Sequence, residues 1–560
     1  MKKTERLFTP IASIKDLVDH IGARGEHTVF EYPQGKEYVS LSYAAFHDMI
    51  LGAAAGLCAA GLAGERVALI GESSPEWVAA YLAVIATGGV IIPMDKDLAV
   101  EEIEGFLTGV EARAVFHSAS FTEKFAHARA EHPTLRLFIP FSGEADDKVL
   151  PFPALLEGGK ALPEGSFSLP DRDPEKMAIM LFTSGTTGTS KCVMLSEKNL
   201  VSSVNAACAS VNFSPDDKTV SVLPLHHTYE LTIMLASLTY GFTIGINDSL
   251  RHLMRNFAHF QPTGLILVPL FVSTMYKKIW DEARKKKKDK LLRAMLPISG
   301  GLRRIGIDLR RKLYKDVIGA FGGRLTKIIC GGAPLNPELV RNFDALGIQI
   351  SEGYGITECS PLIAVSPYFA PRAGSVGPAV PCCETRIAVE GQNEKGFDEG
   401  EIQVRGDNVM LGYYQNDAAN AAAFTEDGWF RTGDIGYMDK DGYIYITGRM
   451  KSVIVLENGK NVFPEEIEEY LAKIPEIGES VVVGRKIPDG DTVNLIAVIY
   501  PSPEVFPAGT PAEEIEAKLR EKITALNRKL PSFKKITDIE IRETEFEKTT
   551  SRKIKRHLVH

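Results

Sequence analysis

Short apolar runs alternate with helix-length segments over roughly the first 380 residues of this chain. Each run is only a few residues long, which is typical of strands that are buried on both faces of a sheet. Strands that are joined through helices lie parallel, because such a connection carries the chain back to the end of the sheet from which it started. We therefore predict an α/β region with parallel sheets covered by helices. The runs are Val67 to Ile70, Gly89 to Pro93, Ala114 to His117, Leu137 to Pro140, Met177 to Phe182, Leu265 to Pro269 and Lys327 to Cys330.

The pattern changes after Gly400, where short alternating strands and tight turns predict hairpins. A smaller α+β unit then follows Lys451. We place the domain boundary between these regions, with an N-terminal domain over residues 1–449 and a C-terminal domain over residues 450–560. The elements expected in the smaller unit are a strand from Val453 to Leu456, a helix opened by Pro464, a strand from Ser480 to Gly484 and a helix from Pro511.

Composition excludes several classes of protein. Hydrophobic residues make up 44% and charged residues 24% of the 560 residues, which is typical of soluble globular domains. The formal net charge of −8 lacks the basic excess of a dedicated nucleic-acid binder. The seven cysteines show no C-x-x-C spacing, and their odd number favours free thiols in a reducing compartment. The most apolar long stretch, Met49 to Gly64, is mostly Ala and Gly and predicts a soluble helix, so we expect a cytoplasmic protein.

The segment Leu181 to Leu195, with the sequence LFTSGTTGTSKCVML, is the most informative in the chain. A buried strand leads into hydroxyl-bearing residues and glycines, whose backbone N–H groups and side chains can cradle phosphate oxygens. The alternative is a flexible surface turn. A Walker A loop is excluded, because two residues separate the last glycine from the lysine. The predicted phosphate-binding residues are Thr183, Ser184, Gly185, Thr186, Thr187, Gly188 and Lys191.

This segment resembles the TSGTTGxPKGV signature of the acyl-adenylate-forming superfamily, which includes acyl-CoA synthetases, luciferases and the adenylation domains of peptide synthetases. The chain departs from that signature at Ser190 and Cys192. The resemblance implies a large N-terminal domain of two α/β layers plus a distorted β-barrel, with a small C-terminal α+β lid domain.

A second segment, Gly353-Tyr-Gly-Ile-Thr-Glu358, resembles the family's YGxTE motif. The resemblance implies that Tyr354 stacks on adenine, that Thr357 meets the phosphate and that Glu358 helps to hold Mg²⁺, with Thr183 as a second metal residue. An aromatic face, a hydroxyl and a hard oxygen ligand suit those three roles. The alternative is that Tyr354 is packed in the core and Glu358 is merely solvated.

Further segments follow in the family's order. The loop with Gly332 and Ala333 resembles the one that lines the adenine and acyl pockets. By the same resemblance, Asp434 accepts hydrogen bonds from the ribose hydroxyls, and Arg449 closes the ribose side. Lys451 then matches the hinge of the lid, and Gly459 matches the glycine that the lid brings toward a tunnel for the pantetheine arm.

The roles of two further side chains stay open between several interpretations. His227, beside His226, resembles the histidine near the acyl carboxylate; metal binding and a structural role are the other interpretations. Lys553 resembles the adenylating lysine, and a lysine there would neutralise the charge that develops on the phosphates. Lys555 is the rival, because Arg552 replaces the family's glycine, and a solvated basic tail is the third interpretation.

The resemblance implies an AMP-forming acid–thiol ligase, most like long-chain fatty acid CoA ligases. It would activate a medium- or long-chain fatty acid with Mg-ATP and transfer the acyl group to CoA. The alternatives are an acyl-AMP synthetase that loads a carrier protein, a luciferase-like oxidoreductase and a catalytically silent nucleotide-binding regulator. Small molecules are the expected partners, nucleic acid is not, and the oligomeric state stays open. The basic run Arg284 to Lys290 is interpreted as a solvated helix face, with contact to anionic lipid headgroups as a minor, membrane-peripheral hypothesis.

Overall fold

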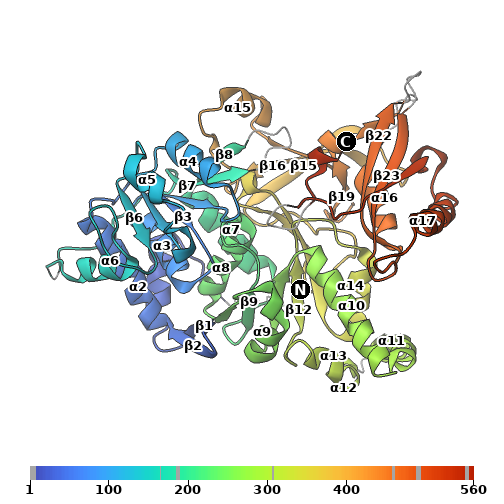
Figure 1. The fold of residues 1–560 in the computed structure, drawn as a ribbon, viewed down its shortest axis with the longest axis horizontal. Helices are drawn as coiled ribbons and strands as arrows, with labels where there is room; N and C mark the ends of the chain where they lie inside the picture. Colours follow the sequence, from blue (N-terminus) through green and yellow to red (C-terminus); the bar gives the residue numbers. More distant parts are fainter. Residues whose placement is uncertain are drawn as a thin grey trace. The chain divides into compact units, whose positions relative to one another are not determined.

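The computed structural model describes residues 8–163, 165–183, 190–304, 308–456, 461–486, 493–548 and 554–559. The chain divides into two compact units (Figure 1). The described residues of the first unit fall within 8–183, 190–384 and 404–430, and those of the second unit within 385–403 and 431–559. The boundary that we place between residues 449 and 450 stays a prediction.

A seven-stranded sheet organises the N-terminal part of the first unit, in the order β17-β8-β7-β4-β3-β5-β6. Its central strands are parallel, as the alternating pattern predicted, whereas β8 and β17 run antiparallel at one edge. The strands are β3 (Arg66–Ile70), β4 (Val90–Met94), β5 (Ala114–His117), β6 (Leu137–Pro140), β7 (Met177–Thr183), β8 (Lys191–Ser196) and β17 (Gly412–Tyr413).

Helices cover this sheet, as expected for parallel strands. Ile103 and Leu107 of α4, with Ala128 of α5, pack against apolar side chains of β3, β4 and β5. The surrounding helices are α1 (Ile14–Gly22), α2 (Tyr43–Ala59), α3 (Pro75–Ala86), α4 (Val100–Gly109), α5 (Ala126–Glu131) and α6 (Phe152–Lys160).

The helix predicted from Met49 to Gly64 is α2, but α2 ends at Ala59. Gly61 takes a left-handed φ of 68°, and the N–H of Leu62 donates to the carbonyl of Leu57. These features stop a helix by satisfying its last carbonyls, so the prediction was too long at its C-terminal end.

Two four-stranded sheets complete the larger part of the first unit, in the orders β2-β1-β10-β9 and β11-β12-β13-β14. The strand predicted from Leu265 to Pro269 is β11, which ends at Leu267 because Pro269 opens helix α10. The strands are β1 (Thr28–Gln34), β2 (Glu37–Ser42), β9 (Lys218–Ser221), β10 (Thr243–Ile246), β11 (Gly264–Leu267), β12 (Lys327–Cys330), β13 (Gln349–Gly355) and β14 (Leu362–Val365). The helices are α7 (Glu197–Ser210), α8 (Thr228–Tyr240), α9 (Leu253–Phe260), α10 (Pro269–Lys285), α11 (Asp289–Arg304), α12 (Arg310–Leu313), α13 (Lys315–Gly319), α14 (Pro337–Leu346) and α15 (Asp417–Ala423).

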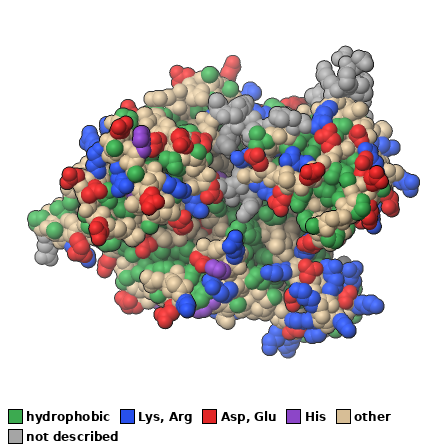
Figure 2. All heavy atoms as spheres, in the orientation of Figure 1, with side chains coloured by type: hydrophobic (Ala, Val, Ile, Leu, Met, Phe, Trp, Pro, Cys, Tyr) green, Lys and Arg blue, Asp and Glu red, His purple; other side chains and the backbone are tan. Residues whose placement is uncertain are grey.

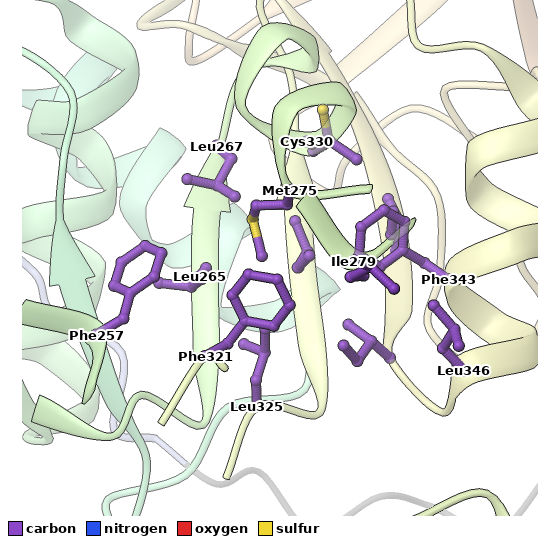
Figure 3. Close-up of a cluster of buried hydrophobic side chains, with 14 of the residues drawn as sticks. Phe257, Leu265, Leu267, Met275, Ile279, Phe321, Leu325, Cys330, Phe343 and Leu346 are labelled. Atoms are coloured by element: carbon purple, nitrogen blue, oxygen red, sulfur yellow. The ribbon is translucent and has the colours of Figure 1, made fainter. Parts of the chain in front are cut away.

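Strand β11 separates two apolar regions, because alternate residues of a strand point to opposite faces. Leu265 and Leu267 point into a core cluster with Met275 and Ile279 of α10 and with Phe343 of α14 (Figure 3). Gly264 and Ile266 therefore face the other side of the sheet.

The second unit contains most of the sheet β15-β16-β18-β19 and the whole of a three-stranded sheet, β22-β23-β24. Helices α16 and α17 pack on the three-stranded sheet through Ile467, Leu471, Leu519 and Ile523, which makes the predicted α+β unit. The elements are β15 (Cys383–Gln392), β16 (Asp398–Gly406), β18 (Phe430–Met438), β19 (Ile444–Arg449), β20 (Ile454–Val455), β21 (Asn461–Val462), β22 (Ile477–Lys486), β23 (Val493–Pro501), β24 (Asp538–Ile541), α16 (Pro464–Leu471) and α17 (Ala512–Asn527).

Two expectations from composition can be compared with the structure. All seven cysteines lie in described parts of the chain and are free thiols, as expected. None of the helices in the described ranges has both the length and the hydropathy needed to cross a membrane.

Candidate active site

The predicted phosphate segment begins on a hairpin of the seven-stranded sheet. Thr183 is the last residue of β7 and pairs with Lys191, the first residue of β8. The Thr183 hydroxyl donates to the Lys191 carbonyl at 3.3 Å, so the two ends of the segment are held side by side. The intervening predicted residues, Ser184, Gly185, Thr186, Thr187 and Gly188, lie outside the described residues. The sequence analysis did not expect β8, although the apolar run after Lys191 is typical of a strand.

Glu358 lies in the short helix η3 (Thr357–Cys359) and is half-buried. Its Oε1 accepts a 2.9 Å hydrogen bond from the hydroxyl of Tyr413, a residue of β17. Nζ of Lys191 lies 4.4 Å from the centre of the Tyr413 ring, at a distance typical of a cation–π contact. Burial and the nearby Glu358 carboxylate raise the pKa of Tyr413, so its phenol stays protonated and donates.

Tyr413 is a residue of the candidate site that the sequence analysis missed. It is 55 residues from Glu358 in the chain and belongs to none of the motifs that resemble the family's. Its position in the sheet brings the two together, since Tyr413 pairs with Val193 of β8, and the Met410 N–H donates to the Glu358 carbonyl at 2.8 Å.

The oxygen atoms of Glu358 and Thr183 suit a magnesium ion. Mg²⁺ bound with a nucleotide takes one or two carboxylates, phosphate oxygens and water, and does not require a cage of protein ligands. Among the described residues, no group of three or more His, Cys, Asp or Glu side chains is placed to hold a metal. A carboxylate and a hydroxyl are oxygen donors of the kind that a metal shared with a nucleotide takes.

An apolar cavity of about 110 Å³, partly open to solvent, lies beside the predicted adenine residues. Gly332, Gly353 and Tyr354 all line it, and Tyr354 is only 7% exposed. Gly332 has a φ of +86°, which favours glycine, and Ala333 after it is exposed. The rest of the lining comes from α8 and its neighbours, and includes Tyr229, Ile233, Ala236, Tyr240, Phe213, Phe242, Ile266 and Ile329.

His227 caps the N-terminus of α8, where its carbonyl accepts the N–H of Leu231. Its ring lies 4.4 Å from the ring of His226. Burial and the nearby Lys96 lower the pKa of His226 to about 3, so His226 is neutral at pH 7 and its 3.5 Å approach to Asp95 is not an ion pair. The position of His227 at the start of the helix that lines the cavity is compatible with the substrate-side role.

The second unit pairs the two predicted ribose residues. Asp434 of β18 stands opposite Arg449 of β19, and Nε of Arg449 lies 2.9 Å from Oδ1 of Asp434. The Asp434 side chain is 5% exposed and that of Arg449 is 51% exposed. The arginine therefore covers a carboxylate that is otherwise buried.

The remaining predicted residues belong to the C-terminal region. Lys451 is exposed in the short helix η4 (Met450–Ser452), directly after β19. Gly459 and Lys553 lie outside the described residues. The rival Lys555 is half-buried, and its N–H donates to the carbonyl of Glu547 at 2.8 Å.

With this geometry established, comparisons with known proteins decide the family. A family model described as "AMP-binding enzyme" matches residues 18–414, and one described as "AMP-binding enzyme C-terminal domain" matches residues 451–560. The chain belongs to the AMP-binding enzyme family. The first match contains the predicted residues from Thr183 to Glu358, and the second begins at the predicted hinge residue, Lys451.

Individual relatives cover most of this AMP-binding enzyme. The chain is 31% identical to long-chain-fatty-acid–CoA ligase FadD15 of Mycobacterium tuberculosis, over 82% of this chain and 77% of the relative. It is 28% identical to the peroxisomal long chain acyl-CoA synthetase 6 of Arabidopsis thaliana, over 82% of this chain and 68% of the relative. Among solved structures, it is similar to ATP-bound MatB from Rhodopseudomonas palustris, with a TM-score of 0.74, 26% identity and 98% coverage of both chains.

Proposed function

We propose that this AMP-binding enzyme is an AMP-forming acid–thiol ligase for fatty acids of medium or long chain. The observation that carries the proposal is the apolar cavity, because the glycines and the tyrosine of the predicted adenine motifs form part of its wall. A cavity with this lining suits an alkyl chain and leaves the carboxylate near the nucleotide. The names of the relatives support a fatty acid and CoA as substrates.

The proposed reaction has two steps. In the first, an oxygen of the fatty acid carboxylate attacks the α-phosphorus of ATP, which forms acyl-AMP and releases pyrophosphate. In the second, the thiol of CoA attacks the acyl carbonyl carbon and releases AMP. Neither step needs a nucleophile from the protein, so the enzyme acts by positioning its substrates and stabilising charge.

The residues have distinct proposed roles. Mg²⁺, held by Glu358 and Thr183, would neutralise charge on the phosphates. Asp434 would accept hydrogen bonds from the ribose hydroxyls, and Lys553 would stabilise the developing charge in the first step. For the second step, we propose that the C-terminal domain turns about Lys451 and brings Gly459 toward the pantetheine arm.

The direct test is ATP-dependent release of pyrophosphate across fatty acids of increasing chain length, with and without CoA, together with mass spectrometry of the product. The proposal requires acyl-AMP without CoA and acyl-CoA with it. Two other results would contradict it. Acyl-AMP that reacts only with a phosphopantetheinylated carrier protein would favour the carrier-loading alternative, and light emission with a luciferin, ATP and oxygen would favour the luciferase-like one.

The sequence analysis interpreted the basic run Arg284 to Lys290 as a solvated helix face. The structure shows instead that the run does not lie on one continuous helix. Helix α10 ends at Lys285, and α11 begins at Asp289. Lys287, between the two helices, takes a left-handed φ of 54°, which a continuous helix does not allow. The run therefore forms a tight connection that presents its basic side chains to solvent.

We propose that this connection and the neighbouring helices α11 to α13 meet the surface of an anionic phospholipid bilayer. Residues 277–324 contain sixteen Lys and Arg against five Asp and Glu, in a chain with a net charge of −8. Figure 2 shows the basic side chains gathered over this part of the first unit. Exposed apolar side chains, Leu291 at 57% and Ile298 at 59%, accompany them. Basic and apolar side chains together suit an anionic membrane surface.

Sedimentation with vesicles tests the contact. We expect binding to vesicles that contain phosphatidylserine, weaker binding in high salt and none to pure phosphatidylcholine. The double variant Lys286→Glu/Lys287→Glu should lose most of the binding. A matched charge change at two exposed lysines of the second unit, Lys518→Glu/Lys529→Glu, should not. Equal loss in both variants would refute a local contact.

A further inference from the structure

Three aromatic rings line one part of the apolar cavity, those of Phe213, Tyr240 and Phe242. The Phe213 and Phe242 rings stack with their centres 5.4 Å apart, and the Tyr240 ring lies 6.1 Å from Phe213 and 5.8 Å from Phe242. None of the three residues is more than 3% exposed. The Tyr240 hydroxyl donates to the carbonyls of Cys208, at 2.6 Å, and Val211, at 3.2 Å, so this polar group is engaged by the backbone.

The backbone and side chains around Phe213 hold its ring in one place. A Cβ atom at Gly264 would lie 2.4 Å from the ring, so only a glycine leaves room for it there. Nζ of Lys327 lies 4.4 Å from the ring centre, donates to the Asn212 carbonyl and pairs with Asp217 at 2.9 Å. The ring is therefore closely packed by its surroundings.

The register of β11 and β12 shows how the cavity runs. Gly264 pairs with Lys327, and Ile266 pairs with Ile329, two residues further along each strand. Both isoleucines line the cavity, so Gly264 and Lys327 lie on the cavity face, one step deeper. Gly331, which also lines the cavity, follows at the other end of β12. Four residues separate Lys327 from Gly331, which corresponds to about 13 Å of strand.

Helix α8 gives a second measure of the depth. Tyr229 lies beside Gly331, since a Cβ on that glycine would come within 3.2 Å of the tyrosine ring. Tyr240 is eleven residues further along the helix and belongs to the aromatic group with Phe213 and Phe242. At about 1.5 Å per residue, this separation is about 16 Å. An extended alkyl chain advances about 1.25 Å per carbon, because its bonds are about 1.5 Å long and meet at a near-tetrahedral angle. The length of about 13 Å along β12 and that of about 16 Å along α8 therefore correspond to about ten to thirteen carbons.

We propose that Phe213 is the floor of the acyl cavity and sets the chain length that this enzyme prefers. The inference rests on the proposed function, because it assumes that the cavity holds the acyl chain. Gly264 sets the height of the floor, since the absence of a side chain there leaves room for the Phe213 ring beside β11. The preferred substrates are then fatty acids of about ten to thirteen carbons beyond the reacting carboxylate, and longer chains meet the ring.

Chain-length profiles of the wild type and two opposed variants test this proposal. The ratio of kcat/KM for hexadecanoate to that for dodecanoate is measured by pyrophosphate release. Phe213→Ala should raise this ratio about tenfold or more, because it opens this part of the cavity to further methylene groups. Gly264→Ala should lower it, because the added methyl group pushes the ring into the cavity. Phe213→Leu, a smaller change in volume, should raise the ratio less and serves if the alanine variant does not fold.

Phe121→Ala is the matched control, because Phe121 is equally buried but belongs to the core of the seven-stranded sheet. It should leave the ratio unchanged. A uniform loss of rate at every chain length in the folded Phe213 and Gly264 variants would overturn the proposal, as would a wild type that prefers octadecanoate. If no fatty acid supports pyrophosphate release by the wild type, the proposed function itself fails.

Discussion

The hydroxyl of Tyr413 donates a 2.9 Å hydrogen bond to the carboxylate of Glu358, although 55 residues separate them in the chain. The same tyrosine also contacts Lys191, whose ammonium lies 4.4 Å from the centre of the Tyr413 ring. The tyrosine thus connects the end of the predicted phosphate segment to the predicted metal residue. A side chain held by a charge-assisted hydrogen bond keeps one orientation, which a metal ligand needs.

Tyr413→Phe should therefore impair acyl-AMP formation without removing any atom that meets a substrate. A hydrogen bond to a charged group contributes about 1.5 to 3 kcal/mol, so we expect a loss of about tenfold to a hundredfold in kcat and a higher Mg²⁺ requirement. The measurement is pyrophosphate release as a function of Mg²⁺ concentration.

The neighbouring variant Tyr414→Phe provides the control. The Tyr414 hydroxyl accepts from Arg66 at 3.1 Å and from Gln415 at 3.2 Å, so its loss should leave the Mg²⁺ dependence unchanged. If Tyr413→Phe also leaves it unchanged, Tyr413 does not position Glu358.

Glu358→Gln should abolish acyl-AMP formation in a protein that still folds. A neutral amide is a poorer ligand for Mg²⁺ than a carboxylate, while its shape and its bond from Tyr413 are retained. Pyrophosphate release measures the activity, and circular dichroism with thermal unfolding verifies the fold. Full activity in a folded variant would remove Glu358 from the proposed metal site.

Asp434→Ala should weaken ATP binding, chiefly through lost hydrogen bonds to the ribose. Each charge-assisted bond contributes about 1.5 to 3 kcal/mol, so Kd should rise about tenfold or more. Asp434 could act by bonding to the ribose or only by holding Arg449. Calorimetric titration with ATP and with 2′-deoxy-ATP distinguishes these two roles. Wild type should discriminate between these nucleotides and Asp434→Ala should not; equal discrimination by both would mean that Asp434 serves only to hold Arg449.

Lys553→Ala should depress acyl-AMP formation about 10²- to 10³-fold, as expected for loss of a dominant contact to the transition state. The same variant should still convert supplied acyl-AMP and CoA to acyl-CoA, because the proposed turn of the lid moves this lysine away. Lys555→Ala should leave both steps nearly intact. The opposite pattern would show that the predicted register is wrong by two residues.

Glu230 should make the stability of the first unit depend on pH. It is buried in the first turn of α8 beside the Ser221 hydroxyl, and burial raises its pKa from 4.5 to about 8. Between those values, the folded protein keeps a proton that the unfolded chain releases. The free energy of unfolding therefore decreases as the pH rises from about 4.5 to about 8. Urea unfolding should show a flatter dependence for Glu230→Gln over this range, and an unchanged slope would contradict the assignment.

Sequence patterns determined most of the local structure. Short, mainly apolar runs of four residues predicted β5, β6 and β12 with their observed ends, because short buried strands depend mainly on their own composition. The motif residues likewise identified the region of the candidate site, since residues of two motifs line the same cavity. Helix ends were less certain: α2 ended earlier than predicted, because a turn at Gly61 competes with continued helix.

Only the tertiary structure brought together residues that share no motif. Tyr413 reaches Glu358 because β17 pairs with the edge of a sheet formed far earlier in the chain, and no local pattern specifies that pairing. Phe213 fits at the cavity wall because Gly264 leaves space beside its ring and the ammonium of Lys327 lies against that ring. Those contacts depend on the register of two strands and on the close packing of side chains from distant segments. Sequence alone determined the family's motifs, and packing in three dimensions decided which distant residues line the cavity and which one holds Glu358.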